Sequence, residues 1–130
     1  MHSTNSADTL ITVSADCPVA AGTVPEKPET IAGLQYRLLS ERPYMLTSDN
    51  LLFEVEALRH PGASREEFFA RPQACLRASP LVKRFGWGIH HDHHQRIALV
   101  GAESADYARL LDEPGVKKAP GMRSKRPDQS

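Results

Sequence analysis

The chain has 130 residues, of which 40% are hydrophobic and 25% are charged, and this composition is typical of one soluble globular domain. The 16 Lys and Arg residues balance the 16 Asp and Glu residues, so the chain lacks the basic excess of a dedicated nucleic-acid-binding protein. Two cysteines are too few for a disulfide scaffold, and no apolar run approaches the roughly 18 residues of a membrane span. Because the N-terminus also lacks the pattern of a secretory signal, we expect a cytoplasmic protein with reduced thiols and no membrane partner.

The first third of the chain predicts a strand, a loop and a helix. Residues 9–14 (TLITVS) are rich in β-branched side chains, which favour a short strand. Residues 18–28 are rich in proline and predict a surface loop. Residues 29–41 have the apolar spacing of a helix that buries one face. The apolar stripe of this helix consists of Ile31, Leu34 and Leu38.

Residues 51–58 (LLFEVEAL) fit two structures, because their apolar side chains alternate as in a strand and also recur with a helical period. The cap and turn residues 47–50 come immediately before them, and Asp49 is well placed for a helix N-terminus. This cap favours the helix. Two further short helices are predicted at residues 64–70, which begin with a capping box, and at residues 104–111.

The most informative stretch is SPLVKRFGWGIHHDHHQRIALV, which begins at Ser79. Ser79 suits a helix N-cap and Pro80 suits the first helical position. Gly86 is able to take the left-handed conformation that ends such a helix. The pattern then becomes extended in residues 86–91 and again in residues 96–100, with a polar tip between them. These two runs predict an antiparallel β-hairpin.

The order of these elements predicts a small α+β protein whose antiparallel sheet contains the central hairpin, at about residues 86–100, with several short helices around it. We expect one domain over residues 1–126. Residues 116–126 are basic and are expected to hold a last strand. Residues 127–130 are expected to be a frayed C-terminal tail.

Several segments of the sequence resemble those of a known family. They are MHSTN at the N-terminus, DCPV (16–19), TSDN with LFEV (47–55), SPLVKRFGWGIHH (79–91) and GMRSKR (121–126). The family consists of small bacterial proteins catalogued as a domain of unknown function, and the resemblance runs nearly end to end. It implies a bacterial cytoplasmic protein and supplies no activity, substrate or catalytic residue. Where this chain has Asp92-His93-His94-Gln95, the family carries an acidic, glycine-containing hairpin tip, so the tip histidines are not expected to serve a shared function.

One face of the first hairpin strand is the candidate ligand site. In an extended strand, Gly86, Gly88 and His90 share one face, so that face consists of bare backbone ending in an imidazole. Lys83 and Arg84 come just before it and are suited to hold an anionic group. Two interpretations remain open: a packed helix covers the glycines, which is the commoner case, or a ligand occupies a shallow site there. In both, Trp87 faces the core.

Four histidines surround Asp92, and a cluster of imidazoles suggests a metal site. The geometry of a hairpin disfavours this, because His90 and His91 point to opposite faces while His93 and His94 lie on a turn. We therefore expect no metal and no cofactor. Neither cysteine has the signature of an activated thiol, since Asp16 is an unfavourable neighbour for a Cys17 thiolate and Cys75 follows a plain loop.

No phosphate-binding loop, nucleophile elbow or metalloprotease motif occurs in the sequence. The sequence thus favours a small protein that binds an unknown small molecule or protein partner without catalysis. One alternative is an enzyme or metal-binding protein that uses His90 with Cys17 or Cys75. Another is weak nucleic-acid contact through the basic C-terminal residues, which are Lys117, Lys118, Arg123, Lys125 and Arg126.

Overall fold

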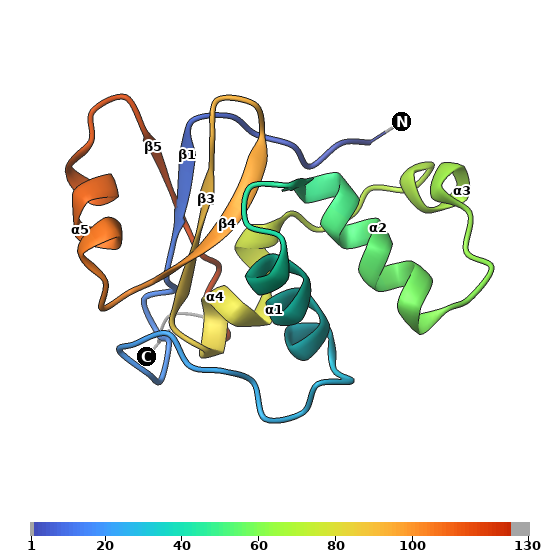
Figure 1. Cartoon of the computed structure of the whole chain (residues 1–130), viewed down its shortest axis with the longest axis horizontal. Helices are drawn as coiled ribbons and strands as arrows, with labels where there is room; N and C mark the ends of the chain where they lie inside the picture. Colours follow the sequence, from blue (N-terminus) through green and yellow to red (C-terminus); the bar gives the residue numbers. More distant parts are fainter. Residues whose placement is uncertain (1, 126–130) are drawn as a thin grey trace.

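A five-stranded sheet with helices on both faces forms the protein (Figure 1) in the computed structural model, which describes residues 2–125. The elements in chain order are β1 (Thr9–Thr12), α1 (Ile31–Glu41), β2 (Leu46–Thr47), α2 (Ser48–Arg59), α3 (Arg65–Phe69), a 3₁₀ turn η1 (Leu76–Ala78), α4 (Pro80–Arg84), β3 (Trp87–His91), β4 (Arg96–Gly101), α5 (Ala105–Asp112) and β5 (Lys117–Pro120). The predicted α+β class is confirmed. The expected tail at residues 127–130 lies outside the described residues.

The strands lie in the order β2-β4-β3-β1-β5. β3 and β4 form the predicted antiparallel hairpin. β1 also pairs antiparallel with β3, and β2 pairs antiparallel with β4. β5 is the exception, because it pairs parallel with β1, from Thr9 opposite Lys117 to Thr12 opposite Pro120. The sheet is therefore mixed rather than antiparallel. Local sequence does not determine this pairing, because α5 carries the chain across the sheet before β5 begins.

Each face of the sheet has its own apolar core, because successive side chains along a strand point to opposite faces. On one face, Ile11, Ile89 and Ile97 pack against the apolar side chains of α1, α2 and α4. On the other face, Leu10 and Val100 pack against Tyr107 and Leu110 of α5, the helix on that side in Figure 1. A single eight-residue helix covers less of a sheet than three helices do.

Hydroxyl N-caps begin five helices, and all but that of Thr30 lie where the sequence predicts a cap. The side chains that accept a backbone N–H in this way are those of Thr30, Thr47, Ser64, Ser79 and Ser104. The cap of Thr47 resolves the ambiguity of residues 51–58, which lie in α2. One core prediction is wrong: Ile31 remains 38% exposed, because the first turn of α1 extends beyond the helices that cover the rest of its stripe.

An aspartate side chain fixes the chain near each of its ends. Asp49, which is 3% exposed, accepts hydrogen bonds from the Ser3 hydroxyl and from the backbone N–H and hydroxyl of Thr4. Asp16 accepts the backbone N–H groups of Ser124 and Lys125. These bonds, led by that of Lys125, lower the pKa of the Asp16 carboxyl. The segments 2–5 and 121–125 are thereby held against the sheet and helices.

Candidate functional site

The five candidate residues do not form one site. Gly86 precedes β3 and has a φ of 76°, so it takes the left-handed conformation predicted for it but does not belong to the strand face. Its α-carbon lies against the backbone of Ala21. Gly88 does lie on the strand, where a Cβ would stand 2.7 Å from the Tyr107 ring and 3.0 Å from the Ile11 carbonyl oxygen. The two glycines are therefore packing positions, not the floor of an open site.

Trp87 lies on the opposite face and fixes the loop that precedes α1. Its indole N–H donates a hydrogen bond of 2.9 Å to the Thr23 carbonyl. Its ring covers Gly22, where a Cβ would come within 2.9 Å of ring carbons, and it lies 5.7 Å from the Tyr36 ring. The indole is half-buried rather than part of the main apolar core. The only tryptophan of the chain thus touches the loop at Thr23.

His90 lies on the sheet face that carries α5, opposite Leu10 in the β1–β3 pairing. Its Nδ1 atom is 2.8 Å from the Tyr44 hydroxyl, and the two rings meet edge to face. Tyr44 has a φ of 57°, a rare conformation for an aromatic residue. Burial lowers the pKa of His90 and raises that of Tyr44, so both groups are neutral near pH 7. The pair lies on the sheet face opposite to Trp87.

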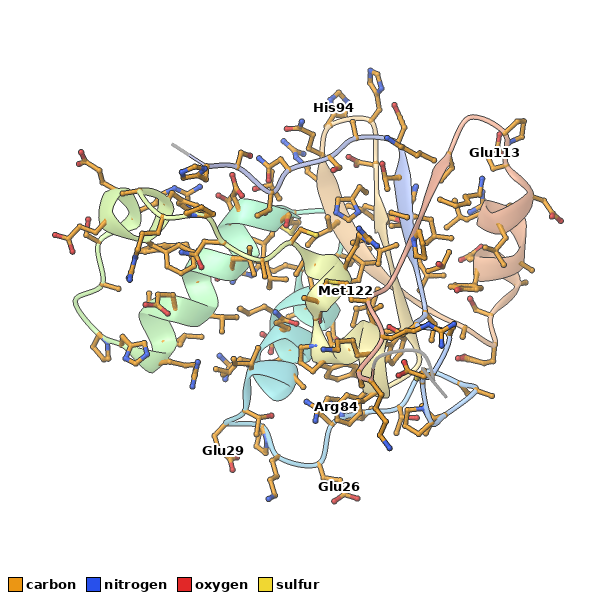
Figure 2. The ribbon with its side chains drawn as sticks, turned by 180° about the vertical axis from the view of Figure 1, so that it is seen from behind. Glu26, Glu29, Arg84, His94, Glu113 and Met122 are labelled. Carbon is orange, nitrogen blue, oxygen red and sulfur yellow. The ribbon has the colours of Figure 1, made fainter. Side chains whose placement is uncertain are left out.

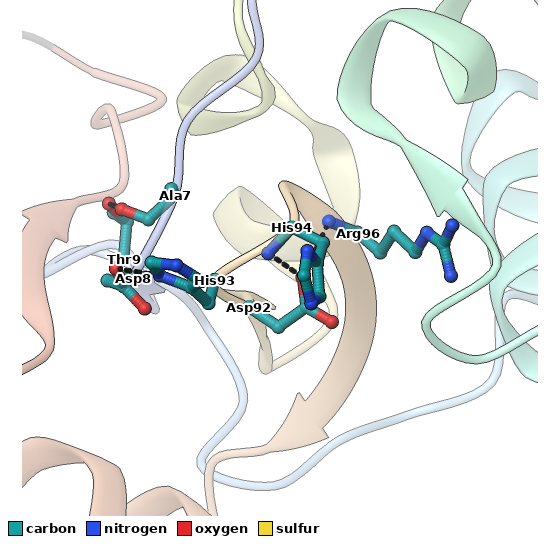
Figure 3. A network of polar contacts seen from close by, with 7 residues as sticks. All are labelled: Ala7, Asp8, Thr9, Asp92, His93, His94 and Arg96. Atoms are coloured by element: carbon teal, nitrogen blue, oxygen red, sulfur yellow. Dashed lines mark hydrogen bonds and ion pairs between the residues drawn. The ribbon is translucent and has the colours of Figure 1, made fainter.

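The hairpin tip is a turn held by polar contacts (Figure 3). The Asp92 carboxylate accepts the backbone N–H groups of His94 and Arg96, and the His93 ring lies 3.1 Å from the Asp8 carboxylate. His93 and His94 are exposed, as expected for a turn. Within residues 2–125, no three His, Cys, Asp or Glu side chains are grouped so that they could hold a metal ion.

The cysteines do not complete a site with His90. Both thiols are free, with Cys17 half-buried and Cys75 exposed. His90 pairs with Leu10 in the sheet, whereas Cys17 follows the far end of β1. Cys75 precedes η1, on the face covered by α1, α2 and α4. The alternative of an enzyme that uses His90 with a cysteine therefore gains no support from the fold.

Lys83 and Arg84 line an open groove of about 980 Å³. The groove lies between the loop of residues 23–27, the first turn of α1, and the C-terminal ends of α2 and α4. Ser124 closes one side of it. Figure 2 shows Arg84 at the end of the molecule that also carries the loop with Glu26 and Glu29.

Positive charge predominates in this groove. Lys27 and Arg59 join Lys83 and Arg84 in its lining, and Glu26 is the one carboxylate among the described lining residues. None of the four cations forms an ion pair within residues 2–125. The backbone N–H groups at the start of α1 add to the positive potential, since a helix N-terminus carries partial positive charge. An anion in the groove would therefore meet favourable charge from several elements.

The groove also has an apolar wall. Val24 is 57% exposed and Ile31 is 38% exposed, and both line it. Phe85 and Pro80 of the α4 region contribute further carbon surface. Concave sites that combine apolar walls with a few charged groups are typical of small-molecule binding sites, and their usual volume is about 300–1,000 Å³.

A comparison with protein families matches residues 1–127 to a model described as a family of unknown function, DUF6157. The chain belongs to this family. The resemblance noted in the sequence is thus confirmed for nearly the whole chain, and DUF6157 membership assigns no activity to any residue. No curated protein and no solved structure shows detectable similarity to the chain. None of the helices in residues 2–125 has the length and apolar character that crossing a bilayer requires.

In this DUF6157 chain, sequence reasoning located two residues of the groove, Lys83 and Arg84, and missed the other two cations. Lys27 and Arg59 are far from α4 in the sequence and reach the groove only through the packing of α1 and α2 on the sheet. The sequence held a partial signal of the groove at Ile31. This apolar residue begins the helical stripe just after the proline-rich loop.

His91 is the other side chain with an unusual environment. It is 2% exposed, and its Nδ1 atom is the buried side-chain polar atom without a hydrogen-bond partner among the described residues. Burial lowers its pKa. Because β4 pairs Ile97 with both His91 and Leu46, the ring lies within the main core rather than in the groove.

Proposed function

We propose that this protein is a binding protein for a small organic anion, and that the anion occupies the groove beside α4. The single observation that carries this proposal is the convergence of four cations from three parts of the chain on one concave surface. Lys27 comes from the loop, Arg59 from α2, and Lys83 and Arg84 from α4. Charged hydrogen bonds between such side chains and a carboxylate or phosphate are the strong ones in proteins.

The stabilisation of helix ends accounts for only part of this arrangement. Cations in the last turn of a helix interact favourably with its dipole, which explains Arg59 on α2 and the two cations of α4. It does not explain Lys27, which lies in a loop. It also does not explain why the lining holds a single carboxylate in a chain with equal numbers of acidic and basic residues.

Binding fits the lining better than catalysis does. Among the described lining residues there is no His, Cys, Tyr or Asp, so the remaining candidates for a nucleophile or a general base are Glu26, the two lysines and the hydroxyl groups. The Thr23 hydroxyl donates to the Ala21 carbonyl, and the Thr30 hydroxyl donates to the Lys27 carbonyl while it caps α1. These hydroxyls have structural roles and no adjacent base.

A titration with matched anionic and neutral ligands tests the proposal. Benzoate is compared with benzamide, and phenyl phosphate with benzyl alcohol. Binding is measured by calorimetry and by the fluorescence of Trp87, whose indole N–H is hydrogen-bonded to the carbonyl of the groove residue Thr23. We expect only the anionic members to bind, with an affinity that falls as salt is added. The double variant Lys83→Ala/Arg84→Ala should lose at least about tenfold in affinity, because it removes two charged contacts.

The matched control is Arg71→Ala/Lys117→Ala, which removes the same charge from exposed positions outside the groove. We expect this control to bind as the parent does. Equal binding of the anionic and neutral ligands would contradict the proposal. So would equal losses in the two double variants, since the anion would then respond to net charge rather than to the groove.

A further inference from the structure

We infer that the ligand of the groove is amphipathic, with an anionic head at the cations and an apolar body along the wall formed by Val24 and Ile31. This inference rests on the proposed function and adds the chemical class of the ligand. Val24 and Ile31 are two of the few large hydrophobic side chains that folding leaves exposed, and both line the same concave surface. An apolar body would remove them from water, which burial of carbon surface favours.

The polar groups of the groove argue against a sugar or nucleoside body. Such a body needs neutral hydrogen-bond partners, and leaving its hydroxyls unpaired would cost binding energy. The hydroxyls of Thr23 and Thr30 already donate to backbone carbonyls of the loop. The remaining wall is mainly carbon from Val24, Ile31 and Phe85, and Ser124 adds one further hydroxyl at its edge. The groove therefore offers contacts to charge and to carbon, and few to neutral polar groups.

The concave shape selects a free molecule over a membrane surface or a flat protein partner. A volume of about 980 Å³ is at the upper end of small-molecule sites and accommodates a medium-chain acyl group with its head. Residues that insert into a lipid surface must protrude from the protein, whereas Val24 and Ile31 line a hollow. The proposed occupant is therefore a free medium-chain carboxylate, or the corresponding alkyl phosphate.

A chain-length series tests this inference. Butanoate, octanoate and dodecanoate are titrated into the protein below their micelle-forming concentrations, with octyl phosphate and octanol alongside. Each fully buried methylene tightens binding by about fourfold. Because the groove is open, we expect octanoate to bind about thirtyfold more tightly than butanoate, a smaller gain than full burial of each methylene would give. Octanol should bind at least about tenfold more weakly than octanoate, and octyl phosphate at least as tightly as octanoate.

Two double variants test separately the contacts to the apolar body and the contacts to the anionic head of the ligand. Val24→Thr/Ile31→Thr keeps a β-branched side chain at both positions and should flatten the dependence on chain length, whereas Lys83→Ala/Arg84→Ala should weaken the binding of every carboxylate by the same factor. The matched control is Met45→Thr/Leu111→Thr, which alters two similarly exposed hydrophobic residues outside the groove and should bind as the parent does.

The outcomes distinguish this inference from the proposed function. If carboxylates bind through Lys83 and Arg84 with no dependence on chain length, the amphipathic ligand is wrong and the anion-binding groove stands. If octanol binds as well as octanoate, the proposed function itself fails. Sedimentation of the protein with phosphatidylserine vesicles, without binding of free octanoate, would also overturn the inference, because the occupant would then be a lipid surface.

Discussion

Gly88 on β3 and Lys83 on α4 are close in the sequence, yet they lie in regions of opposite character. Gly88 faces α5, where the Tyr107 ring leaves no room even for a Cβ. Lys83 faces a groove of about 980 Å³ with apolar and cationic walls. The first region is sealed by a helix packed directly on the strand. The second is an open groove between the loop of residues 23–27 and α4.

If the groove is the binding site that we propose, this difference teaches which sequence features indicate a site. A strand glycine permits close approach, and here the approaching group is a side chain of the protein itself, the Tyr107 ring, whose hydroxyl also accepts the Val13 backbone N–H. Cations beside exposed hydrophobic residues are the more informative feature, because within residues 2–125 these cations form no ion pair and the hydrophobic side chains remain exposed.

The sealed region should not tolerate a larger side chain. Gly88→Val should lower the free energy of unfolding by about 3 kcal/mol, because the new side chain meets the Tyr107 ring and the Ile11 carbonyl. Thermal or urea unfolding measures the change. Gly115→Val is the control, since a Cβ there meets no atom within 4 Å, and it should change stability by no more than about 0.5 kcal/mol. Equal stability of the two variants would show that the glycine face is open.

Trp87 connects the sheet to the groove loop, so its loss should affect both stability and binding. Trp87→Ala should cost about 2 kcal/mol, which is less than for a fully buried aromatic residue because the indole is half-buried. It should also weaken anion binding by calorimetry, because the loop loses the hydrogen bond at Thr23. A destabilised variant with unchanged anion affinity would show that the loop is positioned without the indole.

The buried His91 in the main core should lower the free energy of unfolding at mildly acidic pH. Burial lowers the pKa of His91 below its ordinary value of 6.5, so the folded state holds a neutral ring while the unfolded chain binds a proton below about pH 6.5. The stabilisation linked to the neutral His91 ring is thus fully present above the pKa of His91 in the unfolded chain. It is lost as the pH falls towards the pKa of His91 in the folded state, by at most about 1.4 kcal/mol per pH unit. His91→Phe removes the titrating ring without breaking a hydrogen bond at Nδ1. It should therefore flatten the pH dependence of the free energy of unfolding, measured by urea unfolding.

His90 has a pKa lowered in the same direction, so the pH dependence needs a second comparison. His90→Asn should reduce the slope less than His91→Phe, because His90 is partly exposed and His91 is 2% exposed. If His91→Phe leaves the slope unchanged, the ring is not held neutral by burial and this part of the core is open to water.

The hairpin tip should show the smallest effect. His93→Ala/His94→Ala should change stability by no more than about 0.5 kcal/mol, because both rings are exposed and the Asp8–His93 contact lies in solvent. Thermal unfolding measures this, and the carboxylate of Asp92 should continue to hold the turn. A large loss of stability would mean that the tip carries a bound ion or partner.

Local patterns predicted the elements of this fold well. The caps of Ser79 and Ser104, the left-handed Gly86 and the β3–β4 hairpin all depend on residues adjacent in the sequence. The parallel pairing of β5 and the exposure of Ile31 depend on packing between distant segments, so local patterns did not predict the pairing and gave only a partial signal at Ile31. The proposed site shows the same limit. The sequence predicted Lys83 and Arg84, which are neighbours on α4, and did not predict Lys27, which reaches the groove from the loop.

The most direct test of the account is a map of backbone amide chemical shifts by NMR as octanoate is added. The account predicts that the amides of Thr23, Ile31 and Lys83 shift in proportion to occupancy, while those of Gly88 and Tyr107 remain in place. Shifts centred on Gly88 and Tyr107, with the groove amides unchanged, would contradict it and would return the site to the glycine face of β3.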